Sequence, residues 1–332
     1  MMWFENLMGF AEESPTQVRA NLEVDSNRIV SRVNGNSIIH GNLQTPSLAE
    51  LRLMTPQRRL PSGQISVREI IADVKSLHCD SDNAGALFQV ASQFNLLEMP
   101  SQYETPERGV GVYEHDPTQG PACAVAAGAG TIYRCYLADV NGRTGQSADN
   151  QIDCLKELGD ALGNTDERLW KMENGYAMAT SSGLLETSEK LMAMPRHERD
   201  ALRQKLRIGV QWDTQVTLHG CTHLVTQVFG SAMPVAYSPH ASGLWAELSQ
   251  LVLEASYEAT LWAAILNFAR TGNNKVYLTL LGGGVFGNND DWIFAAIKRA
   301  LELFARVPLD VAIVSYKASK PPVKKLASLI YG

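Results

Sequence analysis

The sequence has no excess of basic residues. Its 332 residues include 29 Lys and Arg against 35 Asp and Glu, which gives a formal net charge of -6. Proteins that bind the phosphate backbone of a nucleic acid usually carry a basic patch or a basic overall charge. The charge balance therefore argues against a nucleic-acid partner. At this length the chain forms one large domain or two modest ones.

The sequence also lacks a long apolar run and a secretory signal. Its apolar stretches fall short of the roughly 20 residues that a membrane-spanning helix needs. Residues 1–15 carry Glu5, Glu12 and Glu13, whereas a secretory signal would begin with Lys or Arg. We therefore expect a protein with no membrane partner, and the cytoplasm is its default compartment.

Cysteine is scarce and forms no CxxC pair. The five cysteines are an odd number, which fits reduced thiols better than a disulfide framework. His219, Cys221 and His223 alternate, so on a strand they would share one face, as metal ligands do. A zinc site needs a further ligand that the neighbouring sequence lacks, so we expect a packed strand face and no metal. The sequence likewise indicates no cofactor.

Strand-like and helical patterns alternate along the chain. Apolar runs with strand character occupy residues 86–92, 208–218, 222–238, 275–281 and 309–316. Helical spacing occupies residues 242–270 and 291–306, and a capping-box pattern at Ser66 predicts a helix over 67–78. This alternation predicts an α/β layer fold with a largely buried sheet.

Three parts of the chain differ in pattern. Residues 1–65 form an N-terminal extension, with a hairpin predicted around Asn34-Gly35 and a short amphipathic helix after Ser47. Residues 66–145 and 207–332 carry the alternation of strands and helices and form the core. Residues 146–206 are expected to be a helical insertion, with helices predicted at 149–162, 166–172, 184–194 and 196–206.

A glycine-rich loop is the strongest local signal. Gly282, Gly283, Gly284 and Gly287 fall between a buried-type strand and a helix. Glycines let the backbone approach a ligand closely, so that successive N–H groups and the helix start can point at a phosphate. The spacing matches neither a P-loop nor a dinucleotide fingerprint. The alternative is a tight strand-to-helix turn without a ligand.

A second candidate is the long loop over residues 104–121. It carries Glu104, Glu107, Glu114 and Asp116 before Gly120-Pro121 opens a short helix, and the strand formers of 131–137 follow. A carboxylate beside a bound sugar can orient water or act as a general base. The alternative is a solvated acidic loop.

Glu258 lies in the apolar stretch of the longest helical pattern. A carboxylate on a buried helix face needs partners. We expect a satisfied buried pair or a solvated helix edge rather than a ligand-binding role.

Three pieces of the sequence occur in the order found in macrodomains. They are LFQVASQFN ending at Asn95, then HDPTQGPACAVAAG, then LTLLGGGVFGNNDDWIFAAIKRAL. The chain thus resembles the macrodomain family over roughly residues 78–137 and 208–316. The sequence of these segments is most similar to a divergent macrodomain branch known from a bacterial effector that removes ADP-ribose from an arginine of ubiquitin. The resemblance implies a three-layer α/β/α mixed sheet, with the insertion and the extension added to it.

The resemblance also implies an activity. It predicts an ADP-ribosylhydrolase that cleaves the N-glycosidic bond between ADP-ribose and an arginine of a modified protein, with ubiquitin as one candidate. Position in the motifs assigns the catalytic roles to Glu107 and Asp116, with Glu98 as a third candidate. The alternatives are a non-catalytic module that binds ADP-ribose or ADP-ribosylated protein, and a hydrolase of a small ADP-ribose derivative.

Ligand-binding roles follow from the same resemblance. Asn95 would bind the distal ribose, near which Phe286 would stack, and Asp82 would accept a hydrogen bond from the adenine amine. The pyrophosphate would meet backbone groups of the two loops. The remaining residues expected to contact ADP-ribose are Gln89, Ser92, Gly120, Gly283, Gly284, Val285, Gly287 and Asn288.

Overall fold

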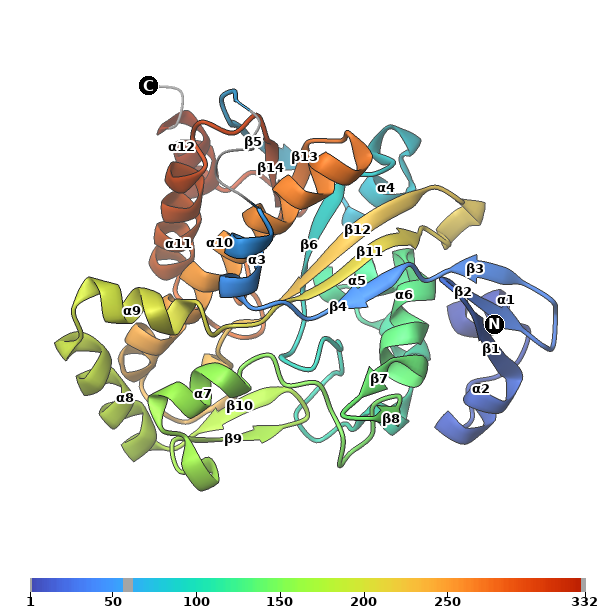
Figure 1. The fold of residues 1–332 in the computed structure, drawn as a ribbon, viewed down its shortest axis with the longest axis horizontal. Coiled ribbons are helices and arrows are strands. Elements are labelled where there is room, and N and C mark those ends of the chain that lie inside the picture. The colour runs from blue at the N-terminus through green and yellow to red at the C-terminus, as the bar shows by residue number, and fades with distance from the viewer. Residues whose placement is uncertain (1, 56–61, 330–332) are drawn as a thin grey trace.

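The computed structural model describes residues 2–55 and 62–329, and a seven-stranded mixed sheet runs through it (Figure 1). Its strand order is β4-β11-β12-β6-β13-β14-β5. Neighbouring strands from β12 to β5 are parallel, whereas β11 is antiparallel to both β12 and β4. The strands are β4 (Asn42–Gln44), β5 (Ser66–Ile71), β6 (Leu87–Ala91), β11 (Gly209–Gln215), β12 (Leu224–Gly230), β13 (Lys275–Leu278) and β14 (Asp310–Ser315).

Helices cover both faces of this sheet. Adjacent residues of β6 show this, because consecutive side chains of a strand point to opposite faces. Phe88 stacks on His78 of α4 (Val74–Cys79) with ring centroids 3.9 Å apart, whereas Gln89 donates to Thr260 of α10 (Ala246–Thr271). The α4 face also carries α5 (Gln119–Ala126) and α6 (Gly128–Ile132), and the α10 face carries α3 (Leu48–Met54) and α11 (Asp290–Leu303). The predicted three-layer α/β/α class with a mixed sheet is confirmed.

The elements that flank the cleft agree with their sequence patterns. Strand β6 is buried along most of its length, as expected for an apolar run in a parallel sheet. The long helix α10 ends at Thr271, one residue beyond the predicted range 242–270, and Gly272 caps it with a left-handed φ of 76°. Within the described ranges, no helix combines the length and the apolar character needed to cross a membrane.

The helix predicted over 67–78 is wrong in its first half. Residues 66–71 form the edge strand β5, and only α4 is helical. The apparent capping box serves the sheet, because Ser66 Oγ donates to Asp310 and Glu69 accepts from Ser315, both on the neighbouring strand β14. Pairing with β14 thus outweighs the helical spacing of the apolar residues.

The strand predicted over 131–137 is also wrong. Helix α6 leads into a turn of π-helix over Tyr133–Leu137. Thr131 Oγ1 donates to the Ala124 carbonyl at 2.7 Å, and the bare backbone of Gly130 faces Gln211 and Thr214 of β11. The helix packs closely against the sheet through this glycine, whereas Ile132 and Tyr136 are buried in a cluster with Trp3 and Phe4 of the N-terminal segment.

The segment 146–206 is only partly helical. It contains α7 (Lys156–Leu162), α8 (Ser181–Ala193) and α9 (Arg196–Arg203), but the predicted helix 166–172 gives way to a hairpin of β9 (Trp170–Glu173) and β10 (Tyr176–Ala179). Asp166 and Glu167 have φ values of 52° and 58°, which a right-handed helix excludes. The Asn164 side chain accepts from the backbone N–H groups that enter β9 and so turns the chain.

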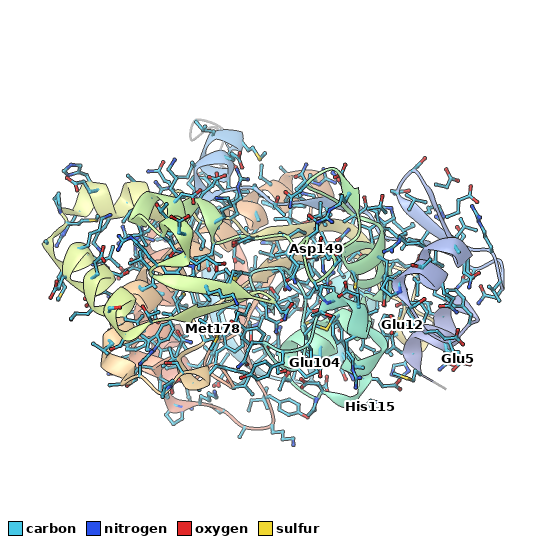
Figure 2. All side chains as sticks on the ribbon, turned by 90° about the horizontal axis from the view of Figure 1, so that it is seen from below. Glu5, Glu12, Glu104, His115, Asp149 and Met178 are labelled. Carbon is cyan, nitrogen blue, oxygen red and sulfur yellow. The ribbon has the colours of Figure 1, made fainter. Side chains whose placement is uncertain are left out.

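Residues 3–39 form a small unit at one end of the molecule and α8 and α9 lie at the other end (Figures 1 and 2), whereas β4 and α3 join the central sheet and the helices on its α10 face. The hairpin predicted around Asn34-Gly35 and the helix after Ser47 are both confirmed, and Ser47 and Glu50 form a complete capping box. The further elements are α1 (Trp3–Met8), α2 (Pro15–Asn21), β1 (Leu22–Asp25), β2 (Arg28–Ser31), β3 (Ser37–Ile39), β7 (Asp139–Val140), β8 (Arg143–Thr144) and α12 (Pro321–Leu329).

The expectation that His219, Cys221 and His223 share a strand face is wrong. Leu218–Gly220 form a 3-10 turn in which His219 has a φ of 54°, and β12 begins only at Leu224. His223 Nε2 lies 2.7 Å from the carbonyl oxygen of His78, so this ring is tied to the end of α4. The three side chains therefore belong to a connection between strands.

Candidate functional site

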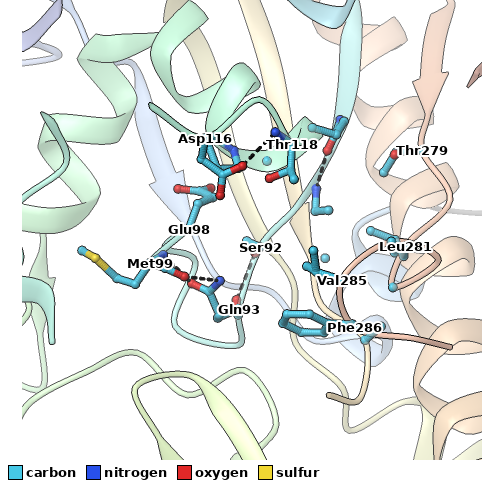
Figure 3. A pocket seen from close by; sticks show the side chains of 18 of the residues that line it. Ser92, Gln93, Glu98, Met99, Asp116, Thr118, Thr279, Leu281, Val285 and Phe286 are labelled. Carbon is cyan, nitrogen blue, oxygen red and sulfur yellow. Dashed lines mark hydrogen bonds between the residues drawn. The ribbon is translucent and has the colours of Figure 1, made fainter. Parts of the chain in front are cut away.

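A cleft of about 830 Å³, its open mouth included, lies at the carboxyl ends of β6, β12 and β13. Its wall comes from the end of β6 and the loop after it, the start of α5, the end of β12 and the loop after β13 (Figure 3). Parallel strands bring their carboxyl ends to one edge of the sheet, which is where open α/β sheets bind ligands. The fold thus joins segments that lie far apart in the sequence.

The glycine loop forms one wall of this cleft. Gly282 has a φ of 72°, and a Cβ on it would lie 2.5 Å from both the Ala232 side chain and the Asn288 amide. The Asn288 amide donates to the Met233 carbonyl at 2.8 Å, which fixes the loop against the end of β12. A Cβ on Gly284 would meet no other atom within 4 Å, so the space beside this backbone is open to a ligand.

The start of helix α5 forms the opposite wall. A Cβ on Gly120 would lie 2.0 Å from the Ala91 carbonyl oxygen, so only glycine lets the helix approach β6 this closely. The Gln119 side chain accepts from Ala91 N at 2.9 Å and donates to the Gln89 carbonyl at 2.8 Å, which pairs the helix start with the strand end. The first N–H groups of a helix have no partner within it and can receive an anion.

Asp116 lies just before this helix, after the 3-10 helix Gly111–His115. Its Oδ1 accepts from the Thr118 N–H at 2.8 Å, an Asx turn that holds the carboxylate beside the helix start. Figure 3 shows Asp116 and Glu98 on the same side of the cleft. The cleft therefore presents two carboxyl groups opposite the glycine loop.

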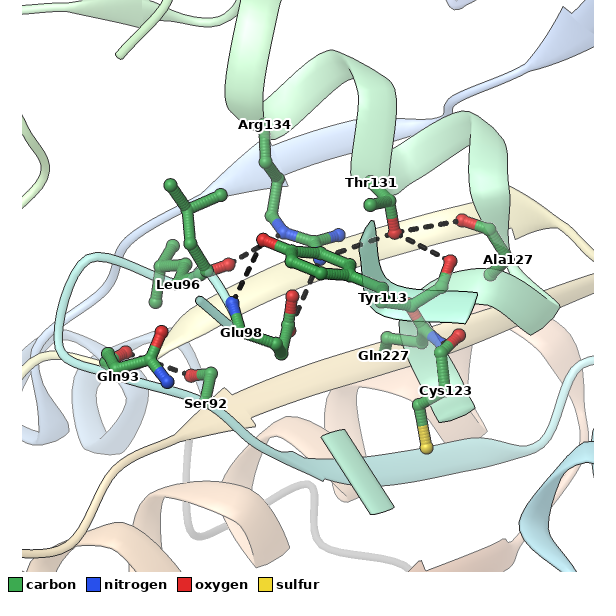
Figure 4. Close-up of polar contacts among 12 residues, drawn as sticks. Ser92, Gln93, Leu96, Glu98, Tyr113, Cys123, Ala127, Thr131, Arg134 and Gln227 are labelled. Carbon is green, nitrogen blue, oxygen red and sulfur yellow. Dashed lines mark hydrogen bonds and ion pairs between the residues drawn. The ribbon is translucent and has the colours of Figure 1, made fainter. Parts of the chain in front are cut away.

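Glu98 is 3% exposed and lies against an equally buried arginine (Figure 4). Its Oε1 is 3.5 Å from Arg134 Nη2, and its backbone N–H donates to the Tyr113 hydroxyl at 3.1 Å. Arg134 is held by the Leu96 carbonyl and lies 3.8 Å above the Phe229 ring. Burial raises the pKa of Glu98 to about 8, although the Arg134 cation acts in the opposite direction. Glu98 Oε2 has no partner among the described residues.

Three aromatic rings pack together at the cleft. Tyr176 of β10, Tyr237 and Phe286 have centroids 5.0 to 5.4 Å apart. The Tyr176 hydroxyl donates to the Met99 carbonyl at 3.0 Å and lies 3.3 Å from the Gln93 amide nitrogen. Such a cluster offers ring faces to a planar or apolar part of a ligand. Sequence reasoning missed Tyr176 and Tyr237, because both come from segments outside the loops that carry the motifs.

The structure brings part of the predicted set together. The predicted residues that line the cleft are Ser92, Glu98, Asp116, Gly120, Gly284, Val285 and Phe286. Those that lie outside its lining are Glu107, Asp82, Gln89, Asn95, Gly283, Gly287 and Asn288.

Two of the predicted residues outside the lining, Gln89 and Asn95, support the fold nearby. The Gln89 amide donates to Thr260, and its oxygen accepts from Thr279 N. The Asn95 side chain donates to Gln151 and accepts from Leu97 N, which shapes the loop after β6. Their amides are thus used within the protein.

Two predicted residues lie in exposed segments. Glu107 accepts a hydrogen bond from Ala148 N at 2.9 Å. Asp82 lies in the 3-10 helix Ser81–Asn83, which precedes β6 and so belongs to the amino end of the strands. The carboxyl ends, where the cleft lies, are at the other edge of the sheet.

No family model and no curated protein matches the chain. Among solved structures, it is similar to poly(ADP-ribose) glycohydrolase from Deinococcus radiodurans in complex with ADP-ribose, with a TM-score of 0.47 and 13% identity over 86% of this chain and 91% of that chain. It is also similar to poly(ADP-ribose) glycohydrolase from Thermomonospora curvata bound to the inhibitor ADP-HPD, with a TM-score of 0.43 and 12% identity over 96% and 97% of the two chains.

Proposed function

We propose that the chain is an ADP-ribosylhydrolase that releases ADP-ribose from arginine of a modified protein. The observation that carries the proposal is the presence of Asp116 and Glu98 in the same cleft as the glycine loop. The sequence resemblance to macrodomains supplies the ligand class, and its most similar branch supplies arginine as the linkage and ubiquitin as the first substrate to test.

The backbone of the cleft suits a pyrophosphate. Gly284, Val285 and Phe286 of the glycine loop line one cavity with Gln119 and Gly120 of α5, and backbone N–H groups at such a loop and helix start bind an anion without a basic side chain. An acidic protein can therefore hold a doubly charged ligand. The aromatic cluster of Tyr176, Tyr237 and Phe286 would pack against a planar or apolar part of the same ligand.

The two carboxyl groups suit cleavage of a glycosidic bond. Loss of the arginine nitrogen from C1″ of the ribose passes through a state with oxocarbenium character, which a nearby carboxylate stabilises. Asp116 would accept a proton from the attacking water while its charge faces the ribose. Glu98 would hold the wall of the cleft beside Asp116 through its contacts with Arg134 and the Tyr113 hydroxyl. Glu107 has no part in this proposal because it lies outside the cleft.

The test is release of free ADP-ribose from arginine-ADP-ribosylated protein by the wild type, Asp116→Asn and Glu104→Gln. Asp116→Asn keeps the side-chain shape and should lower kcat by about 100-fold or more while ADP-ribose affinity stays within a few-fold. Glu104→Gln removes an exposed loop carboxylate and should leave both unchanged.

Three other results would count against the proposal. Binding of ADP-ribose without release from arginine, serine or glutamate linkages would favour a non-catalytic binding module. Release that persists in Asp116→Asn would remove that residue from the chemistry. Release from small ADP-ribose derivatives only would redirect the substrate class away from modified proteins.

A further inference from the structure

The N-terminal extension contacts the acidic segment that carries Asp116 through the Glu12 carboxylate, beside contacts of Trp3 with Val110 and Glu114. Glu12 Oε1 accepts from Val110 N at 2.9 Å, and Glu12 Oε2 accepts from Gly111 N at 2.6 Å. The Tyr136 hydroxyl donates to the same Oε1 at 2.7 Å. Figure 2 shows Glu12 where the blue N-terminal segment meets the green part of the chain. One side chain thus joins three parts of the molecule.

The contact surface is built for this carboxylate. A Cβ on Gly109 would lie 2.6 Å from Glu12 Oε2, and a Cβ on Gly111 would lie 2.7 Å from it. Gly109 also has a φ of 87°, a conformation that other residues adopt only with strain. The two glycines therefore leave bare backbone against which the carboxylate packs.

Glu12 itself is held in place from both sides. Helix α1 before it buries Trp3, Phe4 and Met8 in a cluster shared with the loop and with α5 and α6. Helix α2 after it is capped by Ser14, and the Gln17 amide donates to the Ala11 carbonyl at 2.9 Å. The carboxylate is thus presented from an anchored turn.

The attached segment leads directly to the two cleft carboxyls. The 3-10 helix Gly111–His115 begins at the Glu12 contact and ends at Asp116. Within it, the buried Tyr113 receives the backbone N–H of Glu98, and Glu114 accepts from Trp3 N at 2.9 Å. Displacement of Val110 and Gly111 would therefore shift both carboxyl groups.

We infer that Glu12 is a positioning residue, which fixes the segment 110–116 so that Asp116 faces the cleft. The effect of Glu12 on turnover rests on the proposed function, whereas its effect on the position of segment 110–116 does not. The N-terminal extension thus contributes to the site through Glu12, without touching the ligand itself.

The experiment measures amide hydrogen exchange and turnover in Glu12→Ala, Glu12→Gln and the matched control Glu13→Ala. In Glu12→Ala, amides of residues 110–116 should exchange roughly tenfold faster or more, because two of them lose their acceptor, while amides of β6 and β13 stay protected. kcat should fall by about 100-fold with ADP-ribose affinity within a few-fold of the wild type. Glu12→Gln keeps one oxygen acceptor, so its exchange rates over 110–116 and its kcat should lie between those of the wild type and Glu12→Ala.

The backbone N–H of Glu13 donates to the Gln17 side chain, so Glu13→Ala removes the same charge without touching the segment and should behave as the wild type. Unchanged exchange over 110–116 in both Glu12 variants would overturn the inference. Faster exchange with unchanged kcat would overturn it as well, because the segment would then not govern Asp116. A wild type without hydrolase activity would refute the proposed function instead, and exchange alone would then decide whether Glu12 holds the segment.

Discussion

Glu98 carries a carboxyl group that is harder to ionise than an exposed one. It is 3% exposed, and the cation that pairs with it among the described residues, Arg134, is itself buried and lies 3.5 Å away, farther than in a strong ion pair. Burial raises its pKa to about 8, whereas a carboxyl in the unfolded chain has a pKa near 4.5. The folded protein therefore keeps this proton over a pH range in which the unfolded chain has lost it.

Glu98→Gln should change how stability depends on pH. Between pH 4.5 and 8 the unfolded wild type binds fewer protons at this group than the folded protein, so wild-type stability should fall as pH rises. As pH rises over this range, the free energy of unfolding of the wild type should fall relative to that of Glu98→Gln by at most about 1.4 kcal/mol per pH unit. Urea unfolding of both proteins at pH 5, 6, 7 and 8 measures the difference. Parallel stability curves would show that Arg134 keeps the carboxyl ionised throughout.

Glu258 is a buried carboxylate with a different environment, and the expectation of a satisfied buried pair is confirmed. Its two oxygens accept from Arg52 at 2.7 Å and Arg299 at 2.8 Å, which links α10 to α3 and α11. Glu258→Ala would leave two partly buried guanidinium groups without this partner. Breaking a buried pair on one side costs about 3 kcal/mol or more.

Chemical denaturation should therefore show a loss of about 3 kcal/mol in Glu258→Ala and a smaller loss in Glu258→Gln, which keeps one acceptor. Asp160→Asn removes an exposed carboxylate paired with Lys156 and should stay within about 0.5 kcal/mol of the wild type. A loss in Glu258→Ala no larger than that of Asp160→Asn would mean that the arginines find water or other partners at little cost.

At the scale of elements, the β9–β10 hairpin holds the loop that follows β6. Gly175 at its tip has a φ of 83°, its carbonyl accepts from Phe94 N at 3.0 Å, and a Cβ on it would lie 2.6 Å from the Asn95 amide. The Asn174 amide donates to the Gln102 carbonyl at 2.7 Å. The hairpin thus fixes the loop that presents Glu98 and also supplies Tyr176 to the cleft.

Gly175→Ala should separate the hairpin from this loop. Gly142, in the turn between β7 and β8, is the matched control. It also has a left-handed φ, 76°, but a Cβ on it would meet no atom within 4 Å, so Gly142→Ala has the same backbone strain without the clash that Gly175→Ala makes with Asn95. Both variants should lose about 1 kcal/mol through the left-handed φ, and Gly175→Ala should lose more. Calorimetry should show ADP-ribose binding weakened several-fold in Gly175→Ala only. Equal ADP-ribose affinities in the two variants would show that the hairpin does not affect the binding site.

The elements that sequence reasoning predicted are those whose own residues determine them. The apolar run of β6 and the capped helix α10 carry complete local signals. Strand β5 could not be predicted, because its pattern fits a helix until β14 pairs with it. The hairpin β9–β10 does carry a local signal that the helical prediction passed over, because Asn174 and Gly175 form its two-residue turn with φ values of 47° and 83°.

The same distinction applies to the site. The glycine loop and Asp116 belong to continuous motifs, so the sequence could single them out. Arg134, Tyr176 and Tyr237 reach the cleft or its buried pair only through folding of distant segments. Glu107 is close to Asp116 in the sequence, but the 3-10 helix that Glu12 holds lies between them, and Glu107 ends in contact with Ala148.

For the whole molecule, two buried histidines set the response to acid. His78 lies between the Val74 carbonyl at its Nδ1 and the Gln227 amide at its Nε2, an arrangement that suits only the neutral ring. His40 is buried and stacks on Tyr133 at 3.8 Å. Burial lowers the pKa of each to about 4, from an ordinary value of 6.5. Both are neutral in the folded protein at pH values where the unfolded chain is protonated.

The contribution of the two histidines to stability should therefore be complete above pH 6.5 and fall as pH drops towards 4, by about 1.4 kcal/mol per pH unit for each histidine at most. Glu98 acts in the opposite direction between pH 8 and 4.5, because the folded protein binds its proton more tightly. Carboxylates whose pKa is lowered, such as Asp200, respond only below their unfolded values near 4. Between pH 6.5 and 5 the wild type should thus lose stability with about half the slope of Glu98→Gln. Urea unfolding at pH 7, 6 and 5 tests this, since equal slopes in the two proteins would show that Glu98 does not offset the histidines.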